Sequence, residues 1–284
     1  MKKRQRNRLL LMVIFFFCFL SFQSIAQLIE VDSIPTEKHK SNSKFSLGFE
    51  AGYNNNYLIT NVSDLISTEY ISKSGVSFGI PILYSVNDWF SIEACPSLIE
   101  KNYTMRRTGY YTGVYRDTKN TYLQLPISGQ FSFGGEHLQG YLNLGVYAAY
   151  WSASKITGAM PNILNQPQYG TYINNTNTFS STIFQDYTAY KYDEPYQFNS
   201  IVDNRIELGG IIGGGIKYQF RENGKIFVET KYYYATSDQQ KKYQQGLVPK
   251  YNETYSFSVG YLYNLKKKQH SSVKKTILTD SSIN

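Results

Sequence analysis

Histidine and cysteine are the residues of this sequence best suited to acid–base or nucleophilic catalysis, and both are scarce. The histidines are His39, His137 and His270, and Cys95 is the one cysteine after the apolar N-terminal segment. A Cys–His nucleophile needs its two side chains on neighbouring elements, and a His-based site needs a serine and an acid around it. None of the three histidines has such neighbours at strand spacing, and the set offers no zinc ligands. We therefore expect no enzyme, no metal site and no cofactor.

The glycine-rich stretch GGIIGGGIK at residues 209–217 comes nearest to a phosphate-binding loop. It lacks the Gly-Lys-Ser/Thr ending of a P-loop, and it lies inside an alternating segment rather than between a strand and a helix. Close packing of the interior backbone, or coiling of the strand, explains these glycines better.

Six charged residues lie on the polar faces of segments that alternate between apolar and polar side chains. They are Glu50, Glu93, Glu207, Lys217, Glu229 and Lys231. In an enclosed interior such charges need partners, because an unpaired buried charge is costly. We expect these residues to line an interior and to neutralise one another, and we favour this structural role over ligand binding.

The elements that position these residues are eight segments with the period-two alternation of β-strands. They span residues 44–53, 75–85, 89–104, 120–133, 138–152, 204–220, 226–236 and 253–265. Each is long enough to cross a bilayer at a tilt, which takes about 9–11 residues.

The connections between these segments alternate between short and long. The short turns lie at 86–88, 134–137 and 221–225, and the long polar links at 54–74, 105–119, 154–203 and 237–252. This alternation is typical of bacterial outer-membrane barrels, with short periplasmic turns and long extracellular loops. A soluble β-sandwich has no reason to keep every second loop short.

Composition excludes a helical membrane protein. Aromatic residues make up 16% of the chain, yet the mean hydropathy is −0.39 and no run of apolar residues after residue 26 is long enough for a spanning helix. We predict an all-β fold: an eight-stranded antiparallel up-and-down transmembrane barrel over residues 44–265. A hairpin from the link 154–203, which contains TFSSTIFQDYTAY, would make ten strands.

The two ends of the chain account for all of the formal net charge of +8, because residues 27–265 sum to −1. Residues 1–26 place five basic residues before an apolar run and end in Ser-Ile-Ala, which predicts a secretory signal peptide. We expect residues 27–43 to form a periplasmic linker and residues 266–284 a basic periplasmic tail. Because the charge lies at the ends, the barrel region gives no support for nucleic-acid binding.

The turn between the sixth and seventh segments decides which interior charges face each other. The outward residues of both segments have even numbers and must lie opposite each other, so the numbers of two paired residues add up to an even value. A simple two-residue hairpin would give an odd value and is therefore excluded. A five-residue turn puts Lys217 opposite Glu229, and a three-residue turn puts it opposite Lys231, diagonal to Glu229. We predict an ion pair between Lys217 and Glu229.

Pro126 lies in the middle of the otherwise regular segment TYLQLPISGQFSF. Proline cannot donate to a β-ladder, and a closed barrel has no edge to place it on. We therefore predict irregular pairing at Pro126, through a bulge or through interior water and polar side chains. Pro81 and Pro96 raise the same problem, which predicts a bent wall across the second to fourth strands.

The same segment, followed by a short turn and LQGYLNLGVYAAYW, resembles the PorT-like outer-membrane β-barrel proteins of Bacteroidota. Their fourth strand carries a Tyr-Leu-Glu-Ile-Pro-Leu-like motif, and Gln124 stands here in place of the usual acid. The matching residues are Tyr122, Leu123, Leu125, Pro126 and Ile127. The resemblance implies an outer-membrane barrel without implying one activity; some members take part in type IX secretion or gliding. The basic tail departs from the many barrels that end at an aromatic residue.

Together these features predict a non-enzymatic barrel of the bacterial outer membrane that serves as a surface-binding or structural component, with both termini in the periplasm. Its expected partners are outer-membrane lipid and lipopolysaccharide, an extracellular ligand at the link 154–203, and a periplasmic partner at the tail 266–284. The alternative is a narrow transport component or a protein-secretion accessory, as the type IX resemblance implies.

Overall fold

The computed structural model describes residues 44–60, 67–109, 112–135, 137–161, 189–221, 223–241 and 248–265. The predicted signal peptide at 1–26, linker at 27–43 and tail at 266–284 lie outside these residues. In the described ranges no helix is long and apolar enough to span a membrane.

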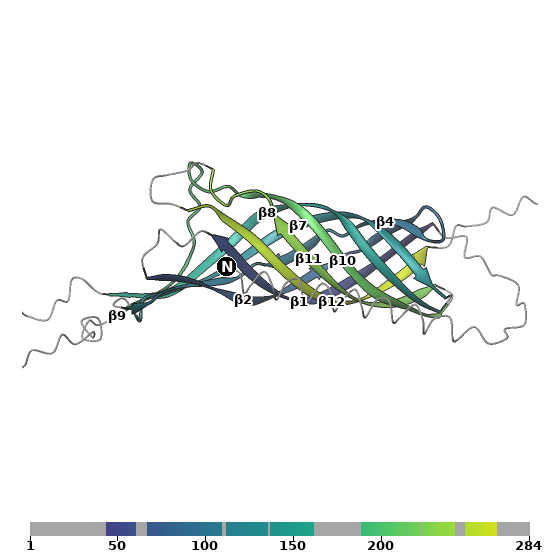
Figure 1. Cartoon of the computed structure of the whole chain (residues 1–284), viewed down its shortest axis with the longest axis horizontal. Coiled ribbons are helices and arrows are strands. Elements are labelled where there is room, and N and C mark those ends of the chain that lie inside the picture. Colours follow the sequence, from purple (N-terminus) through teal and green to yellow (C-terminus); the bar gives the residue numbers. More distant parts are fainter. Residues whose placement is uncertain are drawn as a thin grey trace, which may run out of the picture. The chain divides into compact units, whose positions relative to one another are not determined.

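The described residues form one antiparallel sheet of twelve strands (Figure 1). Their bounds are β1 (Phe45–Thr60), β2 (Thr68–Gly79), β3 (Ile82–Ser85), β4 (Phe90–Ala94), β5 (Ser97–Glu100), β6 (Tyr103–Arg107), β7 (Tyr115–Gly134), β8 (Leu138–Pro161), β9 (Ala189–Pro195), β10 (Ile206–Arg221), β11 (Gly224–Ala235) and β12 (Lys250–Leu265).

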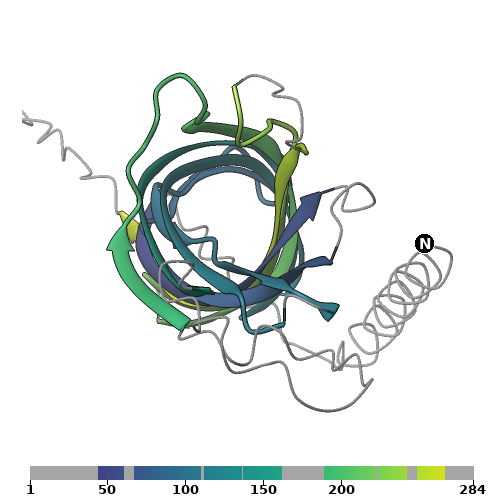
Figure 2. The same ribbon diagram turned by 90° about the vertical axis from the view of Figure 1, so that its left-hand side faces the viewer.

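Strand pairing closes this sheet into a barrel, which Figure 2 shows end-on. β2 and β3 follow each other as one interrupted wall strand, as do β4, β5 and β6. The wall then runs through β7, β8, β10, β11 and β12 back to β1. β1 and β12 pair without a break, from Phe45 opposite Leu265 to Thr60 opposite Lys250. The predicted eight-stranded up-and-down barrel is confirmed.

The link 154–203 adds no strand to the wall among the described residues. β9 pairs only with the outer end of β8, from Lys155 opposite Pro195 to Pro161 opposite Ala189. β10 pairs directly with β8, beginning with Ile206 opposite Tyr150. The hairpin therefore extends beyond the barrel, and the ten-stranded alternative is not adopted. Most of TFSSTIFQDYTAY lies outside the described residues.

Side chains alternate between an apolar outer surface and a polar interior. Phe49 and Val146 on the outside are each 64% exposed, whereas the interior side chains of Asn54 and Gln130 are 0% and 1% exposed. Aromatic pairs lie near both ends of the wall, such as Phe90–Phe131 and Tyr232–Tyr255. This inside-out pattern, with aromatic residues at both ends, is that of a barrel in a lipid bilayer.

The end of the barrel with the turns β3–β4, β7–β8 and β10–β11 is called the short-turn end below, and the opposite end the long-loop end. At the long-loop end the strands continue beyond their predicted limits: β1 reaches Thr60, β8 reaches Pro161, and β6 and β7 occupy much of the expected link 105–119. Beyond the apolar band both faces of a strand can be polar. The alternation that marks a strand in the sequence therefore disappears there, although the hydrogen-bonded ladder continues.

Three prolines lie on adjacent wall strands, and each makes only one of the two backbone hydrogen bonds that join a residue to its partner on the next strand. The carbonyls of Pro81, Pro96 and Pro126 accept hydrogen bonds of 2.9, 3.0 and 3.2 Å from the N–H groups of Gly48, Ile80 and Cys95. The reciprocal bond cannot form because proline has no N–H. The missing bonds divide β2 from β3 at Pro81 and β4 from β5 at Pro96.

A bulge, one of the two alternatives predicted for Pro126, is not found there. Pairing of β7 with β4 and β5 keeps one register across Pro126, since Ile127 lies opposite Ala94 and Gln124 opposite Ser97. The irregularity on β7 falls between Thr121 and Tyr122, where Ser152 of β8 is skipped. A lost donor interrupts a ladder without shifting its register, whereas a bulge needs an extra residue.

Candidate functional site in the barrel interior and at its long-loop end

Five of the six charged residues predicted to line the interior gather toward the short-turn end, where Gln130 joins them. This short-turn cluster consists of Glu50, Glu93, Gln130, Lys217, Glu229 and Lys231. The Lys231 ammonium is its centre, because it pairs with Glu229, with Glu93 at 3.1 Å and with Glu50 at 3.5 Å. One cation thus serves three carboxylates from three different wall strands.

The predicted ion pair between Lys217 and Glu229 is wrong. Lys217 lies opposite Phe227, and the residue opposite Glu229 is Gly215. Among the described residues Lys217 has no carboxylate within ion-pair distance. Its ammonium instead donates to Gln130 Oε1 and lies 4.5 Å from the centre of the Tyr141 ring.

The register error has a local cause. The even sum of paired residue numbers holds along β10 and β11, as expected, but the ladder shifts between Gln219 and Arg221. This shift lets Arg221 pair with Gly224, so the turn is shorter than either predicted version. A regular hairpin with so short a turn would point the interior residues of β11 outward, and for this reason it was not predicted. The irregular pair at Arg221 returns these residues to the interior.

The glycine-rich strand β10 makes room for interior tyrosines. A Cβ on Gly215 would lie 2.7 Å from Tyr141 Oη, and one on Gly209 would lie 2.6 Å from the Tyr147 ring. Cβ atoms essentially never lie this close to another heavy atom, so a side chain at either position would have to displace its neighbour. The interpretation of this stretch as close packing within a strand is confirmed.

A second group of residues, the long-loop cluster, lies toward the other end of the interior. Its core is an ion pair of 2.5 Å between Lys101 Nζ and Glu207 Oε1. Tyr147 Oη donates to Glu207 Oε1 at 2.9 Å, and Asn252 Nδ2 donates to Glu207 Oε2 at 2.6 Å. The Lys101 ammonium also lies 4.7 Å from the centre of the Tyr147 ring.

Sequence reasoning placed Glu207 in the interior but missed Lys101, which is fully buried. The signal was present, because Lys101 lies an even number of residues after Glu93 on the same wall strand and so shares its face. Lys101 lies beyond Leu98, the last outward apolar residue of that segment, where the alternation no longer marks the interior face.

The residues of the PorT-like motif divide between the two faces of β7. Leu123, Leu125 and Ile127 face outward, whereas Pro126 and Tyr122 face the interior. The Tyr122 hydroxyl accepts hydrogen bonds from Gln239 Nε2 at 3.1 Å and Asn252 Nδ2 at 3.2 Å. Tyr122 thereby joins the long-loop cluster to the segment before β12.

An aromatic stack leads from Tyr122 to the long-loop end. The rings of Tyr122 and Trp151 are nearly parallel with centroids 6.0 Å apart, and those of Trp151 and Tyr196 are 5.7 Å apart. Phe198 meets the Trp151 ring edge-on at 4.9 Å. Because Tyr196 and Phe198 follow β9, the stack joins the end of the link 154–203 to the barrel interior.

Polar contacts fix this segment over the barrel. Asp203 accepts hydrogen bonds from Tyr196 Oη at 3.0 Å and from the backbone N–H of Asn199 at 2.7 Å. Arg205 Nε donates to the Trp151 carbonyl at 2.9 Å. Burial, followed by the nearby Asp203 carboxylate, raises the pKa of Tyr196 to about 12.

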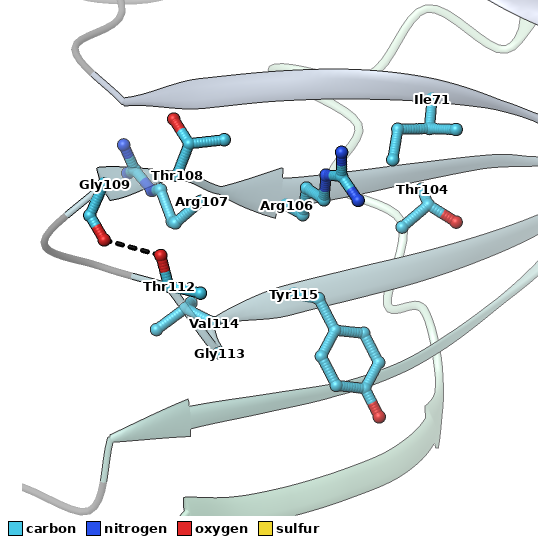
Figure 3. Close-up of a pocket in the computed structure, with 10 residues that line it drawn as sticks. All are labelled: Ile71, Thr104, Arg106, Arg107, Thr108, Gly109, Thr112, Gly113, Val114 and Tyr115. Carbon is cyan, nitrogen blue, oxygen red and sulfur yellow. Dashed lines mark hydrogen bonds between the residues drawn. The ribbon is translucent and has the colours of Figure 1, made fainter. Parts of the chain in front are cut away.

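A wider hollow of about 540 Å³ lies at the tip of the β6–β7 hairpin (Figure 3). Its two arginines are already engaged: Arg106 donates through Nε and Nη2 to Glu69 Oε2, each at 3.0 Å, and Arg107 Nη1 donates to Thr68 Oγ1 at 2.6 Å. The hollow is therefore a weaker candidate than the interior and its long-loop end.

Residues suited to catalysis are separated from one another. Cys95 is buried, and its thiol donates to Glu50 Oε1 at 3.3 Å. His137 lies at the short-turn end, and His39 and His270 fall outside the described residues. Within the ranges that are described, no group of three His, Cys, Asp or Glu residues could hold a metal ion.

Comparison with known families agrees with this architecture. Residues 26–239 match the family model described as outer membrane protein beta-barrel domain. The chain belongs to this family. It is therefore a β-barrel of the bacterial outer membrane, in contact with its lipids. The finer resemblance to PorT-like proteins stays a prediction.

Several solved structures of outer-membrane proteins are similar to this chain. Neisserial surface protein A (Neisseria) is 13% identical, with a TM-score of 0.40 over 78% of this chain and 98% of that chain. OprG of Pseudomonas aeruginosa is 11% identical, with a TM-score of 0.44 over 79% and 98%. The outer membrane protease OmpT of Escherichia coli is 8% identical, with a TM-score of 0.45 over 82% and 100%. No curated protein matches the sequence.

Proposed function

We propose that this protein is a non-enzymatic, non-conducting barrel that presents a binding surface to the outside of the cell at its long-loop end. The observation that carries this proposal is the contrast between a packed, charge-paired interior and an aromatic, partly polar long-loop end. Rigid barrels that carry loops are scaffolds on which such surfaces commonly lie.

The packed interior supports the absence of conduction. Lys101 is 0% exposed and Glu229 2% exposed, although both lie inside the wall. Side chains that line a water-filled channel would be accessible to water. An eight-stranded barrel has an interior that side chains can fill, in contrast to the wide channel of a porin.

The proposed orientation rests on the connections. The three connections at one end are tight turns, whereas those at the other end include the β8–β9 extension and the segment that holds Tyr196 and Asp203. In outer-membrane barrels the longer loops are extracellular. We therefore assign the long-loop end to the cell surface and the chain termini to the periplasm.

Cysteine labelling tests the orientation. In intact cells a membrane-impermeant maleimide should label Ser200→Cys at the long-loop end but not Asp88→Cys at the short-turn end. Both positions are exposed, and Cys95 is buried, so the background is low. The opposite labelling pattern would reverse the proposed orientation.

Planar bilayers test the closed interior. The purified protein should show no stepwise conductance, with a porin as the positive control. Discrete steps from the wild-type protein would favour the transport alternative instead.

The second candidate function, a secretion accessory, is favoured by the motif around Tyr122 and Pro126 and would use the tail 266–284 as its periplasmic contact. A deletion strain that loses secreted proteins would support this role. Restoration by the full chain but not by a chain shortened at residue 265 would assign that role to the tail.

A further inference from the structure

A small cavity of about 70 Å³ lies beside the aromatic stack at the long-loop end, and it is called the mouth cavity here. Its lining comes from β6, β7, β8 and β12 and from the segments around Tyr196 and Gln239. Since a water molecule occupies about 30 Å³ in the liquid, the mouth cavity has room for a few waters or for one small ion. A whole sugar ring or a peptide would not fit inside it.

Two buried donors at the mouth cavity have no acceptor among the described residues. Trp151 is 5% exposed, and its Nε1–H has no hydrogen-bond partner. Arg116 Nε is also buried without a partner. Both groups can only donate. Buried donors are nearly always satisfied, so these two indicate an acceptor that is not part of the described chain.

Charge at the mouth cavity points to the same kind of ligand. Arg116 and Lys250 both line it, and in the described part of the chain neither has a carboxylate within ion-pair distance. The one carboxylate in the lining, Asp203, is held by Tyr196 Oη and the N–H of Asn199. These neutral donors do not cancel the charge of Asp203, so the lining carries two cations against one carboxylate and leaves two N–H donors without a partner among the described residues.

We propose that the mouth cavity binds a tetrahedral oxyanion, either inorganic phosphate or sulfate or the terminal group of a phosphate or sulfate ester. Trp151 Nε1–H and Arg116 Nε–H donate to its oxygens, and Lys250 adds positive charge. This inference rests on the proposed function, because it names the ligand chemistry of the long-loop end. The hollow at the β6–β7 hairpin does not qualify, since Arg106 and Arg107 already have partners there.

Trp151 itself supplies the readout. The chain has two tryptophans, and Trp89 lies in a short turn at the far end of the barrel. In a Trp89→Phe background Trp151 is the only tryptophan. Titration of the refolded full chain with phosphate or sulfate, at constant ionic strength set by chloride, should change its fluorescence saturably. If neither phosphate nor sulfate gives a saturable change in fluorescence, the proposal is wrong.

Two variants and a matched control assign the site. Arg116→Gln and Lys250→Gln should each raise the Kd for the anion by about tenfold or more, because each removes a charge-assisted contact. Lys155→Gln is the control, since Lys155 is an exposed cation at the same end that pairs with Asp193 at 2.9 Å; its Kd should stay within about twofold of the parent value. Heat-modifiable gel mobility verifies that each variant folds. An unchanged Kd in folded Arg116→Gln would overturn the assignment.

Reconstitution separates the two sources of the oxyanion. The titration of Trp151 fluorescence with phosphate or sulfate is repeated in phosphatidylcholine vesicles and in vesicles that also contain phosphatidic acid. Equal titration curves in the two assign the site to soluble anions. Loss of the titration only with phosphatidic acid, while phosphatidylcholine vesicles titrate normally, assigns it to a lipid phosphate. If no titration occurs but Ser200→Cys is still labelled on cells, the oxyanion inference falls and the proposed function stands.

Discussion

The two charged clusters of the interior solve the same problem in different ways. In the short-turn cluster one ammonium, Lys231, is shared by three carboxylates, with Lys217 held nearby by Gln130. In the long-loop cluster a single pair, Lys101 and Glu207, is surrounded by neutral donors and rings. The first cluster depends on its central cation and has carboxylates to spare, whereas the second depends equally on both members of its pair.

The largest expected effect comes from Lys231→Met. This change leaves three carboxylates without their shared cation, and it should lower the free energy of unfolding by about 5 kcal/mol. Lys217→Met is the matched control, because Lys217 contacts a neutral amide and a ring, and it should cost about 1–3 kcal/mol. Urea unfolding in lipid vesicles measures both. Equal losses of unfolding free energy would contradict the comparison, because Lys231 would then contribute no more to stability than Lys217.

The next effect compares one chemical change in both clusters. Glu207→Gln removes the one carboxylate that pairs with Lys101 among the described residues, and it should cost about 3 kcal/mol. Glu50→Gln leaves two carboxylates on Lys231 and should cost about 1 kcal/mol or less. The same unfolding measurement ranks them, and a larger loss for Glu50→Gln would contradict the idea that the short-turn cluster has spare acids.

A smaller effect is expected from crowding at the glycines of β10. Gly215→Ala places a Cβ against the backbone carbonyl of Val228 and the side chains of Tyr141 and Glu229, and it should cost about 1–3 kcal/mol by overpacking. Gly210→Ala is the control on the same strand, since its Cβ would meet no atom closer than 4.0 Å. A stable Gly215→Ala variant would show that the β11 backbone and the short-turn cluster can both move aside.

The smallest effect is a pH response at the long-loop end. The pKa of Tyr196 is raised to about 12, first by burial and then by Asp203. Because the pKa is raised, the hydrogen bond from Tyr196 Oη to Asp203 is fully present when the pH is below the ordinary tyrosine pKa near 10. It is lost as the pH rises through about 12. In the Trp89→Phe background, Trp151 fluorescence should therefore change near that pH, and Tyr196→Phe should remove the step. A step that persists in Tyr196→Phe would assign it to another tyrosine.

Much of the wall could be predicted from the sequence, because the bilayer requires one apolar face on every strand. Outward residues such as Phe49 and Val146, and interior ones such as Glu229 and Lys231, lie on the faces that alternation assigns to them. The ladder beyond the apolar band could not be predicted, because near Thr60 and Pro161 neither face must be apolar. The partner of Lys217 was also out of reach, since one irregular pair near Arg221 changes every contact along β10 and β11.

The mouth cavity shows a different limit. Arg116 lies within the link 105–119, which was predicted to be a loop. Trp151 lies next to Ser152, the unpaired residue of a bulge that no local sequence pattern predicts. Tyr196 reaches Trp151 across a link of the chain, so their stacking depends on tertiary structure alone. Positions that come together only after the barrel closes leave no periodic signal in the sequence.

The three wall prolines have a mechanical consequence. Along the line through Pro81, Pro96 and Pro126, three neighbouring ladders each lack one hydrogen bond, whereas the junction of β1 and β12 is paired along its full length. We therefore expect the cylinder to be more compliant along the proline line than where its first and last strands meet. Thermal breathing of the wall should concentrate there, and amide exchange next to the prolines should outpace exchange at the β1–β12 junction.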